Sequence, residues 1–190
     1  MKTLKLWGVL CCMLVGYLGA GVPALAAESV AATGTMEVAF SPDGGAQALV
    51  LRAIASARSD IRMLSYSFTS APVVQALLAA KKRGVSVMLV ADYKNNVLQD
   101  SSTKARAALS ALTSAGVGVF TVKAYAIHHD KVIVVDAKHV QLGSFNYSAS
   151  AESRNSENVL VAWDNPALAK VYLGHFERNY RQAVPYELQY

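Results

Sequence analysis

The segment HHDKVIVVDAKHVQLGSFNYS, residues 128–148, contains two pairs of polar side chains with the same spacing, one on either side of two apolar runs. His129 and Lys131 are two residues apart at the start of the first run. Ser144 and Asn146 are two apart after the second. Side chains two apart on an extended strand share a face, so pairing of the two runs would bring all four into one patch. Such a patch suits a phosphate: the ammonium and amide groups would hold its oxygens, and the imidazole would attack phosphorus.

Each of these residues also has an ordinary structural explanation. A single histidine beside a strand is usually a surface or core residue, and a single lysine is usually a solvated charge. Asp136 has the opposite strand parity from His129 and lies at the far end of the first run, where it is better placed to anchor a turn. His128 would face away from His129, and no compact set of further ligands accompanies them, so the segment predicts no metal site.

The rest of the chain predicts strands that alternate with helices. Runs rich in β-branched and aromatic residues predict strands at 36–40, 61–68, 85–92, 117–123, 131–136, 139–145 and 158–163. Helical periodicity is present at 46–59, 70–84, 102–116 and 165–183. This order predicts one α/β domain with a mixed, largely parallel central β-sheet and helices on both faces. The strands at 131–136 and 139–145 have no helix between them, so we expect a hairpin.

Residues 1–26 have the features of a secretory signal peptide. MKTLK is basic, residues 6–22 are uncharged and apolar, and Ala24-Leu25-Ala26 is a small-x-small cleavage site. The stretch is also long enough for an uncleaved membrane anchor, but its glycines and proline favour cleavage. We therefore expect residues 27–190 to form the domain and the protein to be exported across the inner membrane into the periplasm.

Removal of this leader would change both the thiol content and the charge. Cys11 and Cys12 are the two cysteines, and a mature chain without thiols suits an oxidising compartment. Loss of Lys2 and Lys5, and of no acidic residue, lowers the formal charge of +5 by two. A modest positive charge is compatible with a polyanionic partner but does not identify it. The mature sequence has no long amphipathic stretch with a basic face, so we expect no stable membrane association.

The spacing of the polar residues resembles the signature of the phospholipase D superfamily. That signature is a histidine, a lysine, an aspartate and a Gly-Ser-x-Asn group, here His129, Lys131, Asp136, Gly143, Ser144 and Asn146. Glu157 lies where the short nucleases of the superfamily have a glutamate beside the catalytic histidine. Residues 61–92 and the end of the chain are also similar to its small secreted bacterial endonucleases, the Nuc type.

The resemblance implies a covalent phosphohistidine mechanism that needs no metal or other cofactor. His129 would be the nucleophile, and the lysine, serine and asparagine would bind the phosphate oxygens and stabilise the added negative charge. Glu157 would accept the Nδ1 proton of a histidine, so that Nε2 faces phosphorus. The predicted catalytic residues are His129, Lys131, Asp136, Ser144, Asn146 and Glu157, of which Lys131, Ser144 and Asn146 also bind substrate.

One catalytic role is not filled by a single chain. His129 cannot attack phosphorus and protonate the departing oxygen at the same time. Larger members of the superfamily have a second copy of the motif, but no other histidine of this sequence begins one. A symmetric homodimer would place a second His129 across its interface. Two histidines that share one proton would give a bell-shaped dependence of activity on pH.

We therefore expect a metal-independent phosphodiesterase, an endonuclease that hydrolyses DNA and, as a further substrate, RNA. Such an enzyme would hold the nucleic acid through its phosphates, with little base recognition. The alternative is a phospholipase D-type lipid phosphodiesterase or phosphatidyltransferase, because the same chemistry acts on a headgroup phosphate. A nucleic-acid-binding module without turnover is a third class, which the complete set of catalytic residues disfavours.

Overall fold

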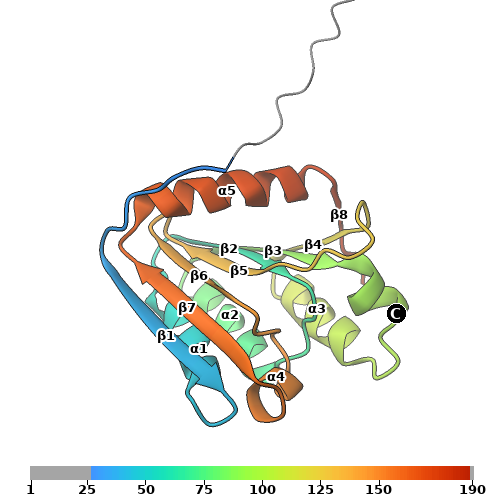
Figure 1. Ribbon diagram of the computed structural model, residues 1–190. Helices are drawn as coiled ribbons and strands as arrows, with labels where there is room; N and C mark the ends of the chain where they lie inside the picture. Colours follow the sequence, from blue (N-terminus) through green and yellow to red (C-terminus); the bar gives the residue numbers. More distant parts are fainter. Residues whose placement is uncertain (1–26, 189–190) are drawn as a thin grey trace, which may run out of the picture.

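An eight-stranded mixed β-sheet forms the centre of the molecule in the computed structural model, which describes residues 27–188. Its order is β1-β7-β6-β5-β2-β3-β4-β8 (Figure 1). The strands are β1 (Thr35–Ser41), β2 (Asp60–Ser65), β3 (Ser86–Asp92), β4 (Gly118–Val122), β5 (Lys131–Val135), β6 (His139–Gly143), β7 (Glu157–Trp163) and β8 (Ala183–Pro185). The predicted signal peptide and both cysteines lie outside the described residues.

The strand directions confirm a mixed sheet and correct one detail of the prediction. β1, β2, β3, β4 and β6 run one way, and β5, β7 and β8 run the other. Within residues 27–188, however, parallel neighbours occur only in the block β2-β3-β4. The sheet is therefore less parallel than expected. Parallel neighbours need a crossover, which helices provide between these three strands, whereas a short turn joins β5 to its antiparallel neighbour β6.

Helices cover both faces of the sheet, as predicted (Figure 1). α1 (Ala46–Ser56), α2 (Ala71–Lys82) and α3 (Lys104–Ser114) lie on one face, and α5 (Pro166–Tyr180) lies on the other. Three short elements were not predicted: a π-helical turn, η1 (Lys94–Leu98), the helix α4 (Ala149–Ser153), and β8. The terminal helix is accordingly shorter than expected, because it ends at Tyr180 and the chain then forms β8.

Alternating side chains of the strands pack into two separate cores. Met63 points to the core under α1, α2 and α3, and its neighbour Leu64 points to the core under α5. The same alternation in β5 sends Ile133 and Val132 to opposite faces. Because both faces are covered, the central strands are apolar on both sides, which explains why their sequences are continuous hydrophobic runs.

The sequence around α2 shows how the helix ends are set. Ser70 is the N-cap, and its hydroxyl accepts a hydrogen bond from the backbone N–H of Val73 at 3.5 Å. Pro72 occupies the first turn, where no N–H is needed. Lys81 and Lys82 lie in the last turn, and Gly84 follows with a φ of +92°. Cations and a left-handed glycine are the favoured residues at a helix C-terminus.

The predicted hairpin joins β5 to β6, and Asp136 holds its turn. Its backbone and that of Ala137 are left-handed, with φ values of 50° and 51°. The carboxylate of Asp136 accepts hydrogen bonds of 2.8–3.2 Å from three successive backbone N–H groups, at Arg58, Ser59 and Asp60. Burial acts to raise the pKa of Asp136, but these donors outweigh it and lower the pKa to about 2. Asp136 therefore anchors the turn at the end of β5 that lies away from Lys131.

Replacing Asp136 with asparagine should make the protein less stable in a pH-dependent way. Asparagine tolerates the left-handed backbone but lacks the charge that the N–H groups bind. We expect the free energy of unfolding in urea to fall by about 1–2 kcal/mol at pH 7. Because the folded pKa lies below the ordinary value of 3.8, the wild-type advantage should be complete above about pH 5 and disappear toward pH 2. A difference that is the same at pH 7 and pH 2.5 would contradict this explanation.

Candidate active site

Most of the predicted site residues lie at one end of the central strands, whereas Asp136 lies at the other end of β5. Lys131 is the first residue of β5, Ser144 follows the last residue of β6, and Glu157 is the first residue of β7. The antiparallel pairing of β5 with β6 and of β6 with β7 puts these three strand ends side by side. His129 lies in the loop just before β5 and is exposed. The hairpin thus brings His129, Lys131 and Ser144 to the same end of the central strands, as the spacing predicted.

One aromatic ring contacts both predicted reactive groups. The rings of Tyr66 and His129 lie with their centroids 4.7 Å apart. The Nζ of Lys131 lies 5.1 Å from the centroid of the same tyrosine and donates a hydrogen bond of 2.8 Å to the backbone oxygen of His129. An ammonium group over an aromatic face is attracted to it. Tyr66 was not predicted as a site residue, although its position just after β2 places it at the same end of the central strands.

Lys131 is an ammonium group removed from water, because only 6% of its surface is exposed. Burial lowers the pKa of Lys131, and the nearby carboxylates of Asp130 and Glu157 only partly oppose that effect. Within residues 27–188, neither carboxylate forms an ion pair with its Nζ. A buried cation of this kind favours an anionic ligand, and the oxygens of a phosphate would supply the missing charge.

Ser144 and Glu157 form a hydrogen-bonded pair beside Lys131. The Ser144 Oγ donates to Glu157 Oε2 at 2.6 Å and accepts from the backbone N–H of Asn158 at 3.1 Å. The other oxygen of Glu157 accepts from Asn155 Nδ2 at 2.8 Å. Both carboxylate oxygens are therefore occupied, and the expected hydrogen bond from a histidine Nδ1 to Glu157 is not formed within the described chain. The carboxylate of Glu157 instead holds the hydroxyl group of Ser144 in place.

Gly143 allows Ser144 to reach this position. Its φ is +148°, and a side chain at this residue would collide with the backbone oxygen of Asn158. That same oxygen accepts the backbone N–H of Ser144 at 3.1 Å. The close approach of β6 to β7 thus requires glycine, which explains the glycine of the predicted signature in physical terms.

Asn146 is placed between two core residues. Phe145 and Tyr147 are fully buried, so the asparagine points the other way. Its Oδ1 is buried and has no hydrogen-bond partner among residues 27–188. A buried carbonyl oxygen without a donor is costly. The group of Asn146 that could donate to a phosphate oxygen is its Nδ2 amide.

Two buried polar side chains, Asp92 at the end of β3 and Asn96 in η1, hold the loops of the site. Asn96 donates from Nδ2 to the backbone oxygen of Tyr66 at 2.6 Å and accepts the N–H of Phe68 at 2.9 Å. The carboxylate of Asp92 accepts the backbone N–H of His128 at 2.8 Å. Asn96 also donates to the backbone oxygen of Asp92 at 2.8 Å. The loop of Tyr66 and the loop of His129 are therefore tied to the same point.

The neighbouring histidines have different environments. His128 is buried, whereas His129 is exposed, so the two point apart as predicted. Burial lowers the pKa of His128, against the opposing charges of Asp130 and Asp92. The Nδ1 of His128 lies 3.4 Å from an oxygen of Asp130 that also contacts His175 Nε2 at 2.9 Å. Asp130 thus links the loop before β5 to helix α5.

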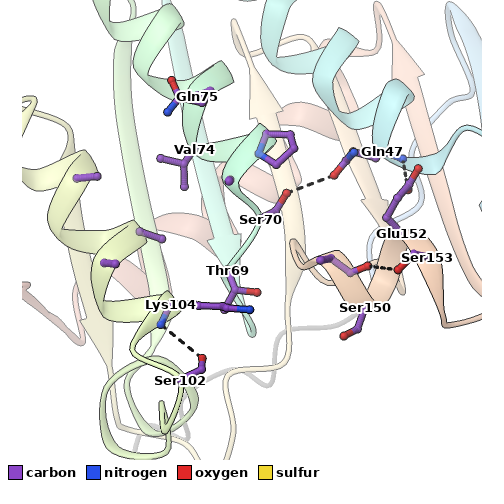
Figure 2. Close-up of a pocket in the computed structure, with 16 residues that line it drawn as sticks. Gln47, Thr69, Ser70, Val74, Gln75, Ser102, Lys104, Ser150, Glu152 and Ser153 are labelled. Atoms are coloured by element: carbon purple, nitrogen blue, oxygen red, sulfur yellow. Dashed lines mark hydrogen bonds between the residues drawn. The ribbon is translucent and has the colours of Figure 1, made fainter.

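The structure also has a large cavity away from these residues. It has a volume of about 860 Å³, lies between α2, α3 and α4, and is lined by alanines of these helices together with Gln75 and Lys104, which Figure 2 labels. None of the predicted site residues lines it. A smaller hollow of about 150 Å³ lies directly beside His129. Within residues 27–188, no three His, Cys, Asp or Glu side chains are grouped as metal ligands, and no helix has the length and apolar character needed to cross a bilayer.

Comparison with known proteins agrees with this geometry. Residues 50–180 match the family model described as cardiolipin synthase, PLD-like domain. The chain belongs to the PLD-like domain family. Its structure is similar to that of a phospholipase D family member, Nuc from Salmonella typhimurium, with a TM-score of 0.77 and 42% identity over 80% of this chain and 98% of that one. The predicted superfamily and its α/β fold are therefore confirmed.

Two curated relatives have names that refer to lipids. Phospholipase D from Rickettsia conorii is 37% identical over 134 residues, which are 70% of this chain and 64% of the relative. Mitochondrial cardiolipin hydrolase from Danio rerio is 30% identical over 141 residues, which are 74% of this chain and 59% of the relative. The chain therefore matches about three fifths of the length of each of these relatives.

Replacing Asn96 with alanine should destabilise the loops of the PLD-like domain. The change leaves the N–H of Phe68 and the carbonyl of Tyr66 without a partner in a dry interior, so we expect the free energy of unfolding to fall by about 2–4 kcal/mol. The matched control is Asn95→Ala, because that side chain is only half-buried and makes no side-chain hydrogen bond within the described residues. Chemical denaturation of the two variants would measure this, and equal losses would show that Asn96 has no special role.

Proposed function

We propose that the protein is a phosphodiesterase that cleaves nucleic acid, DNA first and RNA as a further substrate, through a phosphohistidine intermediate. The observation that carries this proposal is the exposed ring of His129 beside the buried ammonium of Lys131, both packed on Tyr66. A nucleophile lies here beside a cation that has no ion-pair partner among residues 27–188. This arrangement suits the attack on a phosphate better than the binding of a neutral ligand.

The proposed reaction has two steps that use the same groups. The Nε2 of His129 forms a bond to phosphorus as the bond from phosphorus to the departing oxygen breaks, and that oxygen takes a proton from His129 of the partner subunit. Water then attacks phosphorus, the N–P bond breaks, and the water proton passes to His129 of the partner subunit. Lys131, Ser144 and Asn146 would stabilise the added negative charge in both steps. Glu157 would orient Ser144, and Asp136 would act only through the turn that it anchors.

A second copy of the chain is part of this proposal because one chain supplies one reactive histidine. An apolar strip supports it on the sheet face that carries α5. Met36, Val38 and Phe40 of the edge strand β1 are 54%, 55% and 58% exposed. Val38 pairs in register with Leu160 of β7, and Leu160 pairs with Leu142 of β6, so the strip continues to the strand beside β5. An exposed apolar strip on an edge strand favours association.

Nucleic acid is the first candidate substrate because the chain is similar to Nuc, and this similarity covers 98% of the Nuc chain. The relatives named phospholipase D and cardiolipin hydrolase support the second candidate, a lipid phosphodiesterase. We also propose that residues 1–26 direct export to the periplasm and are removed. The N-terminal sequence of protein recovered from the periplasm would test that step.

Cleavage of plasmid DNA should depend on His129 and Lys131 and continue in the presence of a chelator. We expect His129→Ala to lose activity by about a thousandfold or more and Lys131→Ala by about a hundred- to a thousandfold. The matched control, Lys138→Ala, removes an exposed ammonium near the other end of β5 and should leave the rate unchanged. Loss of cleavage with EDTA would reject the metal-independent mechanism, and cleavage by His129→Ala would reject the nucleophile. Hydrolysis of cardiolipin or phosphatidylcholine vesicles without plasmid cleavage would favour the lipid enzyme.

A charged residue introduced into the apolar strip should both separate the two subunits and abolish activity. Val38→Glu puts a carboxylate into the proposed interface, and we expect a monomer in sedimentation experiments and at least a hundredfold loss of plasmid cleavage. Val184→Glu is the control, because Val184 is 51% exposed on β8 at the opposite edge of the sheet. A fully active Val38→Glu monomer would refute the shared site. A Val38→Glu dimer would refute the assigned surface.

A further inference from the structure

We propose that a surface hollow along α5 binds a second phosphate of the substrate strand, next to the phosphate that is cleaved, and that Arg178 is its cation. This inference rests on the nucleic-acid cleavage proposed above and adds a binding site to it. The site lies outside the predicted catalytic set, on a helix more than 30 residues further along the chain than Asn146.

Two adjoining hollows define the site. The smaller, of about 150 Å³, is lined by His129 itself and by residues of α5. The larger, of about 590 Å³, continues along α5 past Tyr172 and Gly174. Asp130, His175 and Arg178 line both. A strand whose scissile phosphate is at His129 can therefore extend directly into this space.

The hydrogen bonds of Arg178 leave its charge available. One guanidinium nitrogen lies 2.6 Å from His175 Nδ1. A guanidinium group only donates, so this imidazole nitrogen accepts, and the proton of the neutral ring is on Nε2. That Nε2–H donates to Asp130 at 2.9 Å. Within residues 27–188, no carboxylate lies within ion-pair distance of Arg178, so its cation is compensated by no direct partner.

Two acidic groups line this space, and a bound phosphate must avoid both: Asp130 lines both hollows, and Glu28 lines the larger one. Burial acts to raise the pKa of Asp130, but the hydrogen bond from His175 and the charges of His128 and Lys131 outweigh it and lower the pKa. The carboxylate is thus ionised at neutral pH, and its contacts with His175 and His128 occupy one of its oxygens, Oδ2. A phosphate would accordingly bind on the Arg178 side, where several guanidinium N–H groups remain free for two parallel hydrogen bonds.

The larger hollow has room for the nucleoside that follows this phosphate. A Cβ built on Gly174 meets no atom within 4 Å, so this part of the helix surface is open. Tyr172 is half-buried at the same hollow, and an aromatic side chain offers a surface on which any base can stack. A phosphate contact followed by a stacking surface suits a polynucleotide of any sequence.

The test compares a substrate that has neighbouring phosphates with one that has none. Arg178→Gln removes the charge and replaces the guanidinium with a shorter side chain that still carries N–H donors. For a single-stranded oligonucleotide we expect KM to rise about tenfold and the log–log slope of binding against salt concentration to fall by about 0.7. For bis(4-nitrophenyl) phosphate, which has a single phosphate, kcat/KM should stay within about twofold of wild type.

Two further variants keep the result interpretable. Lys170→Gln removes an exposed cation from the same helix, at a residue that lines neither hollow. This variant should leave KM and kcat/KM unchanged for both substrates. Gly174→Leu adds bulk to the larger hollow at a position where a Cβ meets no atom within 4 Å, and it should raise KM for the oligonucleotide alone. Equal losses of Arg178→Gln on both substrates, or no loss on either, would overturn the second-phosphate site. Wild-type protein that does not cleave the oligonucleotide would instead overturn the nuclease function and, with it, this site.

Discussion

The buried hydrogen bonds of Asp92 and Asn96 are the constraint on which the geometry of the candidate site depends. Their side chains are almost fully buried, and they pair with backbone groups of two loops that are far apart in the sequence. Those backbone groups would otherwise be unpaired in a dry interior, so the two loops are fixed relative to each other. These hydrogen bonds hold the ring of Tyr66 against the ring of His129. Lys131 packs against the same tyrosine ring.

The electrostatic balance of the site follows from that arrangement. The ammonium of Lys131 is buried near two carboxylates but bonded to neither, since Asp130 is turned toward histidines and Glu157 toward Ser144. The backbone oxygen of His129 and the face of Tyr66 support the cation only weakly. A phosphate would supply a full negative charge at this point without displacing an existing ion pair. Such preorganisation lowers the cost of binding an anion.

Much of this architecture follows from local sequence, and the rest depends on long-range pairing. Seven of the eight strands and the four long helices are predicted by runs of β-branched residues and by helical periodicity, and the cap of α2 by Ser70 and Pro72. No local signal places β1 beside β7, because that pairing joins residues more than a hundred positions apart. For the same reason spacing found His129, Lys131 and Ser144 but missed Tyr66 and Arg178, which reach the site through packing. Glu157 was predicted as a site residue, but its hydrogen bond to Ser144 became visible only in three dimensions.

The exposed apolar residues of β1 have a consequence for how the protein would behave when its concentration changes. Under the shared-site arrangement, the catalytic unit exists only while two molecules are associated, so its abundance obeys mass action. Specific activity would then fall as the protein is diluted and return when it is concentrated. In a small compartment the protein would stay dimeric and active, whereas dilution into a large volume would leave inactive monomers without any inhibitor.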